Sequence, residues 1–319
     1  MRSRAVLVAW LSLVLLLVGG SATAQEAHDW LDRMSRSVEE LNYRGTFVHI
    51  LGGTYKTLYI VHRNADGQSG ERILSMSGTG REIVRQGNLV QSILPDQRVV
   101  LFETRNAVSP LVSALPSNRA ELELHYEIAL GGRARVADRA TQVLEIKPLD
   151  GFRYGYKLWL DRETAMPLQS QLVDEQGGVV EQIMFTEIEV PADIPPGDLE
   201  PTIDTTGFAA LRAAESQTLA AQVSWRAIEL PGGFRLSVRT TSPMAGSDTP
   251  VDHLVYSDGL ATVSVFIESL RTQSEVAEGF SNVGSTNAYT ITLSGRKVTA
   301  IGEVPRETVR TIATSLVPE

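Results

Sequence analysis

The segment from Tyr43 to Arg85 constrains the fold of this chain more than any other. It contains three short apolar stretches, which read YRGTFVHI, TLYIVHR and GERILSMSGTGREIVR. Turns that contain glycine separate the stretches, and Arg, Glu and His stand near their ends. Apolar runs of this length, bounded by such turns, are typical of β-strands. Because nothing in the segment has the spacing of a catalytic loop, a phosphate-binding loop or a metal site, we interpret it as a sheet that presents a surface for binding.

The first residues have the pattern of a cleaved secretory signal peptide. Arg2 and Arg4 precede an apolar run from Ala5 to Val18, and Ala22-Thr23-Ala24 supplies the small residues before a cleavage site. The apolar run is short for a membrane span, and no cysteine follows it, which excludes a lipoprotein anchor. We therefore expect residues 1–24 to be removed and the rest of the chain to be exported.

The composition excludes several classes of function. The chain has no cysteine, which removes thiol catalysis, thiolate metal ligands and disulfides, so its stability must come from packing. Its formal net charge is −9, and the leader carries two arginines and no acidic residue, so the exported part is more acidic still. An acidic protein gains no free energy from counterion release on a polyanion. We therefore expect no nucleic-acid partner.

The periodicity changes from helical to strand-like near Tyr43. Apolar residues recur at spacings of three and four over residues 29–42, which predicts an amphipathic helix with the stripe Leu31, Met34, Val38 and Leu41. Alternating patterns then predict strands over residues 46–50, 57–63, 71–76, 82–85, 89–94, 98–102, 122–130, 141–146, 154–160, 167–172 and 179–190. Short strands joined by tight turns favour one antiparallel, meandering sheet. Residues 111–115 could form a short helix in the break before the seventh strand.

Several of these strands are apolar on both faces. Leu58 and Ile60 would face one side of the sheet, whereas Tyr59 and Val61 would face the other. A sheet with one solvated face alternates more clearly. Both faces must therefore be covered. The pattern leaves open whether helices and the curvature of the sheet cover them or an apolar ligand occupies one face.

A run of proline and glycine over residues 191–197 ends the first sheet, because proline cannot donate to a ladder and restricts the residue before it. Residues 198–222 form a connector with an alanine-rich part over residues 208–214 that could be helical. The following unit has an Asp258-Gly259 hairpin turn, strand patterns over residues 234–240, 252–256, 260–267, 288–293 and 297–301, and a helix over residues 305–316. The sequence thus predicts an α+β protein, with a large N-terminal domain over residues 25–197 and a smaller C-terminal α+β domain over residues 223–319.

No motif indicates catalysis. The five histidines lack the spacing of a metal motif, although His49 and His62 lie on adjacent predicted strands and could form a weak pair. The sequence Gly78-Thr79-Gly80 is followed by a strand pattern instead of the helix that a phosphate-binding loop requires. The glutamate pairs 121/123 and 187/189 are interpreted as solvated strand faces and not as the opposed carboxylates of a glycosidase. We therefore expect no enzymatic activity, no cofactor and no bound metal.

Short motifs along most of the chain resemble those of the MucB/RseB family. They occur in the order found in the family: Trp30–Met34, Tyr43–Val48, Glu71–Leu74, Arg81–Arg85, Arg153–Asp161, Leu230–Phe234, Tyr256–Leu260, Val263–Glu268 and Gly302–Pro305. Each motif alone is weak, but the ordered set is specific and covers nearly the whole exported chain. The sequence departs from the family pattern at His49, where an aromatic residue is commoner, and over residues 201–222, which have no matching motif.

The resemblance implies a periplasmic protein that negatively regulates an envelope-stress sigma factor of the σE/AlgU type. Members of this family bind the periplasmic region of a single-pass anti-sigma factor, RseA or MucA, and protect it from regulated proteolysis. Lipid or lipopolysaccharide signals are expected to release the partner. The resemblance leaves open whether the chain forms a homo-oligomer.

The resemblance also implies that the large domain is similar to lipoprotein carriers of the LolA type, which are curved half-barrels with an apolar groove. Together with the strands that are apolar on both faces, this predicts a groove for lipid or lipoprotein acyl chains, lined by some of Phe47, Ile60, Leu74, Met76 and Ile83. A periplasmic lipid or lipoprotein carrier is the alternative function. The C-terminal domain favours the regulator, because a bare carrier has no need of residues beyond Val190.

Overall fold

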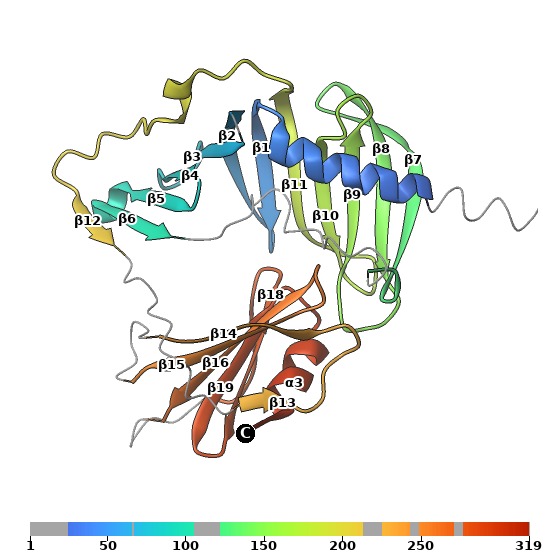
Figure 1. Cartoon of the computed structure of the whole chain (residues 1–319), viewed down its shortest axis with the longest axis vertical. Helices are drawn as coiled ribbons and strands as arrows, with labels where there is room; N and C mark the ends of the chain where they lie inside the picture. Colours follow the sequence, from blue (N-terminus) through green and yellow to red (C-terminus); the bar gives the residue numbers. More distant parts are fainter. Residues whose placement is uncertain are drawn as a thin grey trace, which may run out of the picture.

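The computed structural model describes residues 25–65, 67–104, 122–212, 225–242, 249–270 and 277–318. A large curved sheet crossed by one helix forms the N-terminal unit, and a smaller sheet with one helix lies below it (Figure 1). The expected signal peptide and the expected short helix over residues 111–115 lie outside the described residues. Within them, no helix is long and apolar enough to cross a membrane.

The N-terminal sheet has twelve strands in the order β12-β6-β5-β4-β3-β2-β1-β11-β10-β9-β8-β7. The strands are β1 Tyr43–Leu51, β2 Thr54–Ala65, β3 Gln68–Ser75, β4 Glu82–Gln86, β5 Leu89–Leu94, β6 Val99–Thr104, β7 Tyr126–Val136, β8 Arg139–Pro148, β9 Gly155–Asp161, β10 Pro167–Val173, β11 Val179–Glu189 and β12 Ala209–Arg212. All pairs except β12 with β6 are antiparallel, which confirms the predicted meander. The strand expected over residues 122–130 begins only at Tyr126.

A helix over residues 25–40 packs on one face of this sheet, which we call the inner face (Figure 1). Its apolar stripe contributes to two buried clusters. The first joins the helix to β7, β8 and β9 and contains Trp30, Leu31, Met34, Tyr126, Leu144, Ile146, Leu158 and Leu160. The second joins it to β1, β2 and β11 and contains Val38, Tyr43, Phe47, Ile60 and Phe185. The amphipathic helix and the role of its stripe in the core are confirmed.

The opposite, outer face of the sheet is covered by an extended segment over residues 191–204, which we call the strap. Ala192, Ile194 and Leu199 of the strap pack against Val61 of β2. The short 3-10 helix η2, Pro196–Leu199, lies within it. Both faces of the β1–β2 region are thus covered by the chain itself.

A fully buried carboxylate fastens the strap to the sheet. Glu82 of β4 accepts hydrogen bonds from the backbone N–H groups of Thr202 and Ile203, both at 2.9 Å, and from Thr202 Oγ1 at 3.0 Å. The guanidinium of Arg72 neutralises the carboxylate at 3.0 Å. Burying a charge is tolerated only when it is paired and hydrogen-bonded, and Glu82 meets both conditions.

The alanine-rich part of the connector forms a strand and not the expected helix. Residues Ala209–Arg212 form β12, which pairs in parallel with β6. The guanidinium of Arg98 lies 5.7 Å from the Phe208 ring, and that of Arg212 lies 5.3 Å from the Phe102 ring. The unpaired edge of β6 offers hydrogen bonds to an extended chain, and these outweigh the helix propensity of alanine.

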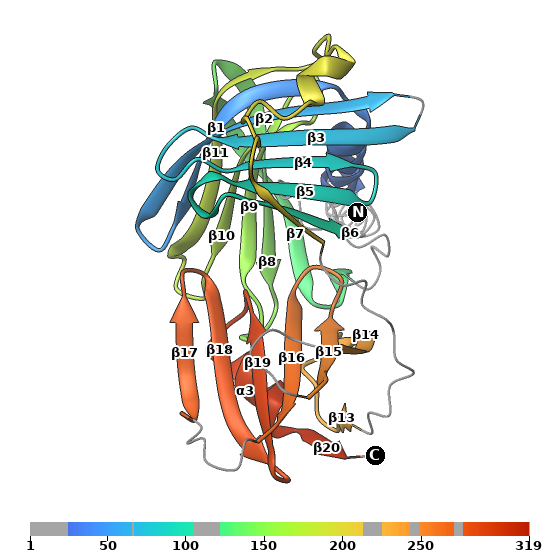
Figure 2. The ribbon, with the colours of Figure 1, turned by 90° about the vertical axis from the view of Figure 1, so that its left-hand side faces the viewer.

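The C-terminal unit is a six-stranded antiparallel sheet in the order β14-β15-β16-β19-β18-β17, with one helix packed on it (Figure 2). Its elements are β13 Trp225–Ala227, β14 Arg235–Ser242, β15 Val251–Ser257, β16 Thr262–Ser269, β17 Gly279–Val283, β18 Thr286–Leu293, β19 Arg296–Gly302, α3 Arg306–Thr314 and β20 Leu316–Pro318. Val309 and Ile312 of α3 join a core with Val263, Val265 and Val298. The predicted hairpin and final helix are confirmed, whereas β13, β17 and β20 were not predicted.

Candidate functional site

The structure divides the five predicted groove residues between different surfaces. Ile60 pairs with Ile73, and Ile73 pairs with Ile83, so these side chains form one cross-strand row on the inner face. Phe47 belongs to the same buried cluster as Ile60 and Ile73. Leu74 pairs with Tyr59 and lies on the outer face.

Met76 follows the end of β3 and is 58% exposed. The structure therefore brings Phe47, Ile60 and Ile83 to the inner face and leaves Leu74 and Met76 elsewhere. Ile73, which the sequence interpretation omitted, belongs to the row. Ile73 and Leu74 are adjacent apolar residues that point to opposite faces, so only the pairing register with β2 reveals which of them points inward.

The inner row of Ile60, Ile73 and Ile83 runs from the closed core towards solvent. Ile60 is fully buried, Ile73 is nearly so, and Ile83 is partly exposed. The row continues across β5 and β6 through Ser92, which is polar and only 5% exposed, and then Leu101, which is partly exposed. Ile83 and Leu101 are therefore the apolar side chains of this row that solvent reaches.

The two units meet through a buried arginine, Arg153, in the loop between β8 and β9. Its side chain is 0% exposed. Nη1 donates to Oδ2 of Asp258 at 2.8 Å, Nη2 donates to the carbonyl oxygen of Gly232 at 2.6 Å, and Nε donates to Asp150 at 3.1 Å. Asp258 and Gly232 belong to the C-terminal unit, so one guanidinium holds both units.

Aromatic rings complete this contact. The guanidinium of Arg153 lies 5.4 Å from the Tyr126 ring of the N-terminal unit and 5.3 Å from the Phe234 ring of the C-terminal unit. The Tyr126 hydroxyl donates to Asp258 at 3.0 Å. Burial, and then the charge of Asp258, raise the pKa of Tyr126 far above its ordinary value, so the phenol remains a donor. Leu260, in the turn after Asp258, packs into the cluster beneath the N-terminal helix.

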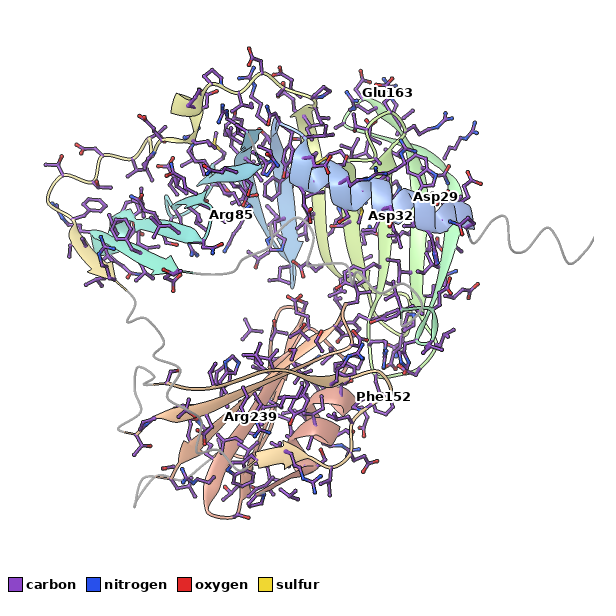
Figure 3. The ribbon with its side chains drawn as sticks, viewed as in Figure 1. Asp29, Asp32, Arg85, Phe152, Glu163 and Arg239 are labelled. Atoms are coloured by element: carbon purple, nitrogen blue, oxygen red, sulfur yellow. The ribbon has the colours of Figure 1, made fainter. Side chains whose placement is uncertain are left out.

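Further contacts extend the junction. Phe152 lies beside the C-terminal unit, and its carbonyl oxygen accepts a 2.5 Å hydrogen bond from Thr308 of α3 (Figure 3). Asn287 Nδ2 donates to the hydroxyl of Tyr154 at 3.0 Å. Gly233 has φ +81°, and a Cβ there would lie 2.4 Å from the His125 ring. Glycine is therefore required at this contact between the two units.

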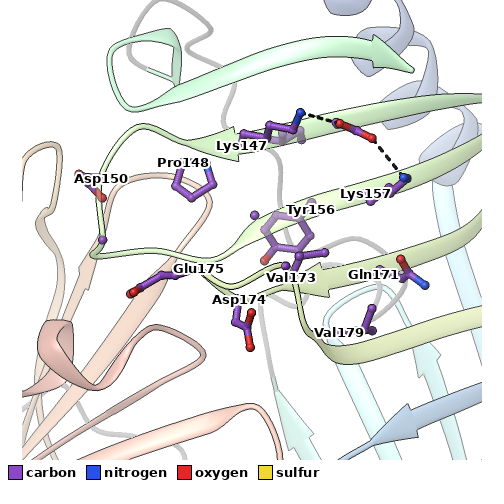
Figure 4. Close-up of a pocket in the computed structure, with 15 residues that line it drawn as sticks. Lys147, Pro148, Asp150, Tyr156, Lys157, Gln171, Val173, Asp174, Glu175 and Val179 are labelled. Carbon is purple, nitrogen blue, oxygen red and sulfur yellow. Dashed lines mark ion pairs between the residues drawn. The ribbon is translucent and has the colours of Figure 1, made fainter. Parts of the chain in front are cut away.

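A pocket of about 640 Å³ lies at the same end of the large sheet (Figure 4). Glu145 stands at its wall between Lys147 at 2.8 Å and Lys157 at 3.1 Å. The hydrogen bond from Lys147 is the main cause that lowers the pKa of Glu145. A second, more polar pocket lies between the ends of β2–β4 and η2. None of the five predicted groove residues lines either pocket.

The structure separates the two histidines that could have formed a metal pair. His62 pairs with Tyr43, stacks on its ring at 4.8 Å and directs Nδ1 to the carbonyl oxygen of Leu41. His49 pairs with Lys56 and contacts Glu181 at 2.7 Å. The possible metal-binding pair of His49 and His62 is therefore wrong. Across the described ranges, no group of three or more His, Asp or Glu side chains is arranged to hold a metal ion.

Comparison with known proteins places both units in one group of relatives. The profile of the MucB/RseB N-terminal domain matches residues 26–203, and that of the MucB/RseB C-terminal domain matches residues 219–317. The chain is 34% identical to the sigma factor AlgU regulatory protein MucB of Pseudomonas aeruginosa, over 96% of this chain and 97% of that protein. It is 28% identical to the sigma-E factor regulatory protein RseB of Escherichia coli K12, over 94% of each.

The fold is also similar to solved structures of such proteins. The complex of MucA and MucB from Pseudomonas aeruginosa superposes with a TM-score of 0.73 at 31% identity, covering 92% of this chain and 99% of that one. MucB in complex with the periplasmic part of MucA gives a TM-score of 0.72 at 32% identity, with the same coverage.

Proposed function

Because this chain belongs to the MucB/RseB family, we propose that it binds the periplasmic region of a MucA/RseA-type anti-sigma factor. By covering that region it protects the anti-sigma factor from regulated proteolysis and keeps the envelope-stress sigma factor inactive. The observation that carries this proposal is the match of both units, in order, to regulators whose solved complexes contain MucA.

The proposal also states where the chain acts and in what way: in the periplasm, and as a binding protein instead of an enzyme. A leader over residues 1–24 would export the chain to the periplasm, where the regulated part of such an anti-sigma factor lies. The chain has no nucleophile–base motif, which supports a binding role over an enzymatic one. The two domains of this proposal span residues 25–197 and 223–319. The connector over residues 198–222 joins them, and its first part, as far as Arg212, packs on or pairs with the N-terminal sheet.

A lipid or lipoprotein carrier is the second candidate, because the inner row of Ile60, Ile73 and Ile83 is apolar and Ile83 is partly exposed. In our proposal this row serves the regulator as a sensor for acyl chains. The C-terminal unit favours the regulator, since the buried contacts of Arg153 make it an integral part of the molecule. A carrier would not need a second unit held in this way.

The proposed function is tested by a pull-down with the tagged mature chain from the envelope fraction of the source organism. We expect mass spectrometry to identify a single-pass membrane protein with an anti-sigma domain. Recovery of lipoproteins without any anti-sigma factor would support the carrier instead.

If acyl chains control release, lipid binding and partner binding must be linked. We expect saturating anti-sigma peptide to weaken the binding of a fluorescent fatty-acid probe, and the probe to weaken peptide binding by the same factor. The measurement is a pair of fluorescence titrations, with and without peptide. Ile83→Glu places a charge in the inner row and should weaken probe binding, whereas the matched change Leu89→Glu, at an exposed leucine, should not. Equal probe affinities with and without peptide would rule the linkage out.

A further inference from the structure

A second polar cluster joins the two units, at the opposite side of the junction from Arg153. Glu181 of β11 contributes Oε2, which lies 3.3 Å from Oγ of Ser285 in the C-terminal unit. The same Oγ lies 2.9 Å from Oε1 of Glu303, after β19. His49 Nε2 contacts the other oxygen of Glu181 at 2.7 Å. Ser285 is only 2% exposed, so water has little access to the centre of this cluster.

The number of protons decides how favourable this contact is. The Ser285 hydroxyl has one proton and can donate to only one of its two carboxylate neighbours. If Glu181 and Glu303 are both ionised, the other short O···O contact has no proton, and two negative charges from different units face each other. One added proton on either carboxyl group supplies the missing donor and removes one charge.

The surroundings favour the uptake of that proton. Burial, and then the charge of Glu181, raise the pKa of Glu303, although Glu303 as a residue is exposed to solvent. From the neighbouring strands, Tyr156 of β9 faces both carboxyl groups, and its own pKa is raised by burial and then by the charges of Glu303 and Glu181. Lys56 of β2 stands opposite His49 in the register. His49 contacts Glu181, and its charge opposes these effects by lowering the pKa of Glu303.

We propose that a proton shared among Glu181, Ser285 and Glu303 closes this side of the junction, so that the two units are held more tightly in weak acid than at neutral pH. The direction of this pH dependence follows from the linkage between proton binding and closure of the junction. A carboxyl group that binds its proton more readily in the closed form stabilises that form at low pH, and this stabilisation is lost as the pH rises through the raised pKa.

The test measures the distance between the units in the full mature chain. Since the sequence has no cysteine, Leu89→Cys and Ile228→Cys, both at exposed positions, give one labelling site on each unit. Pulsed electron spin resonance should give a narrow distance distribution at about pH 5.5 and a broader one at about pH 8, since a carboxyl group with a raised pKa loses its proton as the pH rises. Identical distributions at the two pH values would overturn the proposal.

Three variants show whether the pH response of the distance distribution comes from the shared proton or from other titrating groups. Glu303→Gln carries a permanent donor and no charge, so its distribution should stay narrow at both pH values. Ser285→Ala removes the bridge and should broaden the distribution at both. The matched control Glu307→Gln affects a carboxylate that pairs with Arg310 inside the C-terminal unit, and it should keep the pH response of the parent. A pH response that persists in Glu303→Gln would assign the effect to other groups and contradict the proposal.

Discussion

Replacing Arg153 by alanine is expected to destabilise the folded chain by about 3–5 kcal/mol, because the change leaves Asp258 buried without its cationic partner. Both side chains are inaccessible to solvent, so water cannot take the place of the guanidinium. The carbonyl oxygen of Gly232 loses its donor as well. Urea unfolding followed by tryptophan fluorescence measures the loss.

A matched variant distinguishes this buried pair from ordinary ion pairs. Arg310→Ala removes an arginine that pairs with Glu307 on the exposed side of α3, and we expect it to leave the unfolding midpoint almost unchanged. In the double variant Arg153→Ala/Asp258→Asn, no negative charge remains buried, so the total loss should be smaller than the sum of the two single losses. Equal midpoints for Arg153→Ala and Arg310→Ala would show that Arg153 does not hold the units together.

Glu82→Ala is the second change for which we expect a large effect. It removes the acceptor of three donors in Thr202 and Ile203 and leaves the Arg72 guanidinium in the outer face without its carboxylate. The expected loss is about 3–5 kcal/mol, as for other buried pairs that lose one partner. Because the strap is released, limited proteolysis should also cut the chain within residues 191–204 faster than in the parent.

The control for this change is Glu189→Ala, which breaks the solvent-exposed pair with Arg44. We expect neither a shift in the unfolding midpoint nor faster cleavage of the strap. Glu82→Gln keeps one acceptor oxygen and should fall between the parent and Glu82→Ala. If the strap of Glu82→Ala resists the protease as well as the parent does, another contact must fasten it.

The strands and the N-terminal helix could be predicted because their signals are local. The stripe of Leu31, Met34 and Val38 repeats with the helical period, and glycine turns bound the strands around Tyr43. By contrast, β12 forms because an open strand edge lies beside it, and that edge is contributed by residues about one hundred positions earlier. The short strands β13 and β20 likewise depend on each other across the whole C-terminal unit. No local pattern contains this information.

The same contrast between local signals and long-range contacts applies to the candidate site. The sequence indicated an apolar inner surface, but Ile73 and Leu74 are both apolar and point to opposite faces. Which of them points inward depends on the register between β2 and β3, and the sequence does not specify that register. Arg153 and Asp258 both lie in motifs that resemble the family. The sequence nevertheless presented Asp258 only as a turn residue, because its contact with Arg153 spans 105 positions. A buried charge of this kind is recognisable only once its partner has been placed.

The junction also bears on how the partner is bound. Arg153, Leu260 and the cluster around Ser285 join the two units at separate points, so a long partner segment could contact both units at once. Two linked binding surfaces give a higher affinity than either surface alone, provided that their geometry allows simultaneous contact. We therefore expect the intact chain to bind the anti-sigma segment more tightly than its C-terminal unit does.

Isothermal titration of the purified mature chain with the periplasmic region of the anti-sigma factor from the same organism is the decisive test of the proposed function. We expect saturable binding by the intact chain and weaker binding by the segment from residue 223 to residue 319. We also expect the bound anti-sigma segment to be cleaved more slowly by its periplasmic protease. An intact, folded chain that shows no binding in this titration would contradict the proposed function.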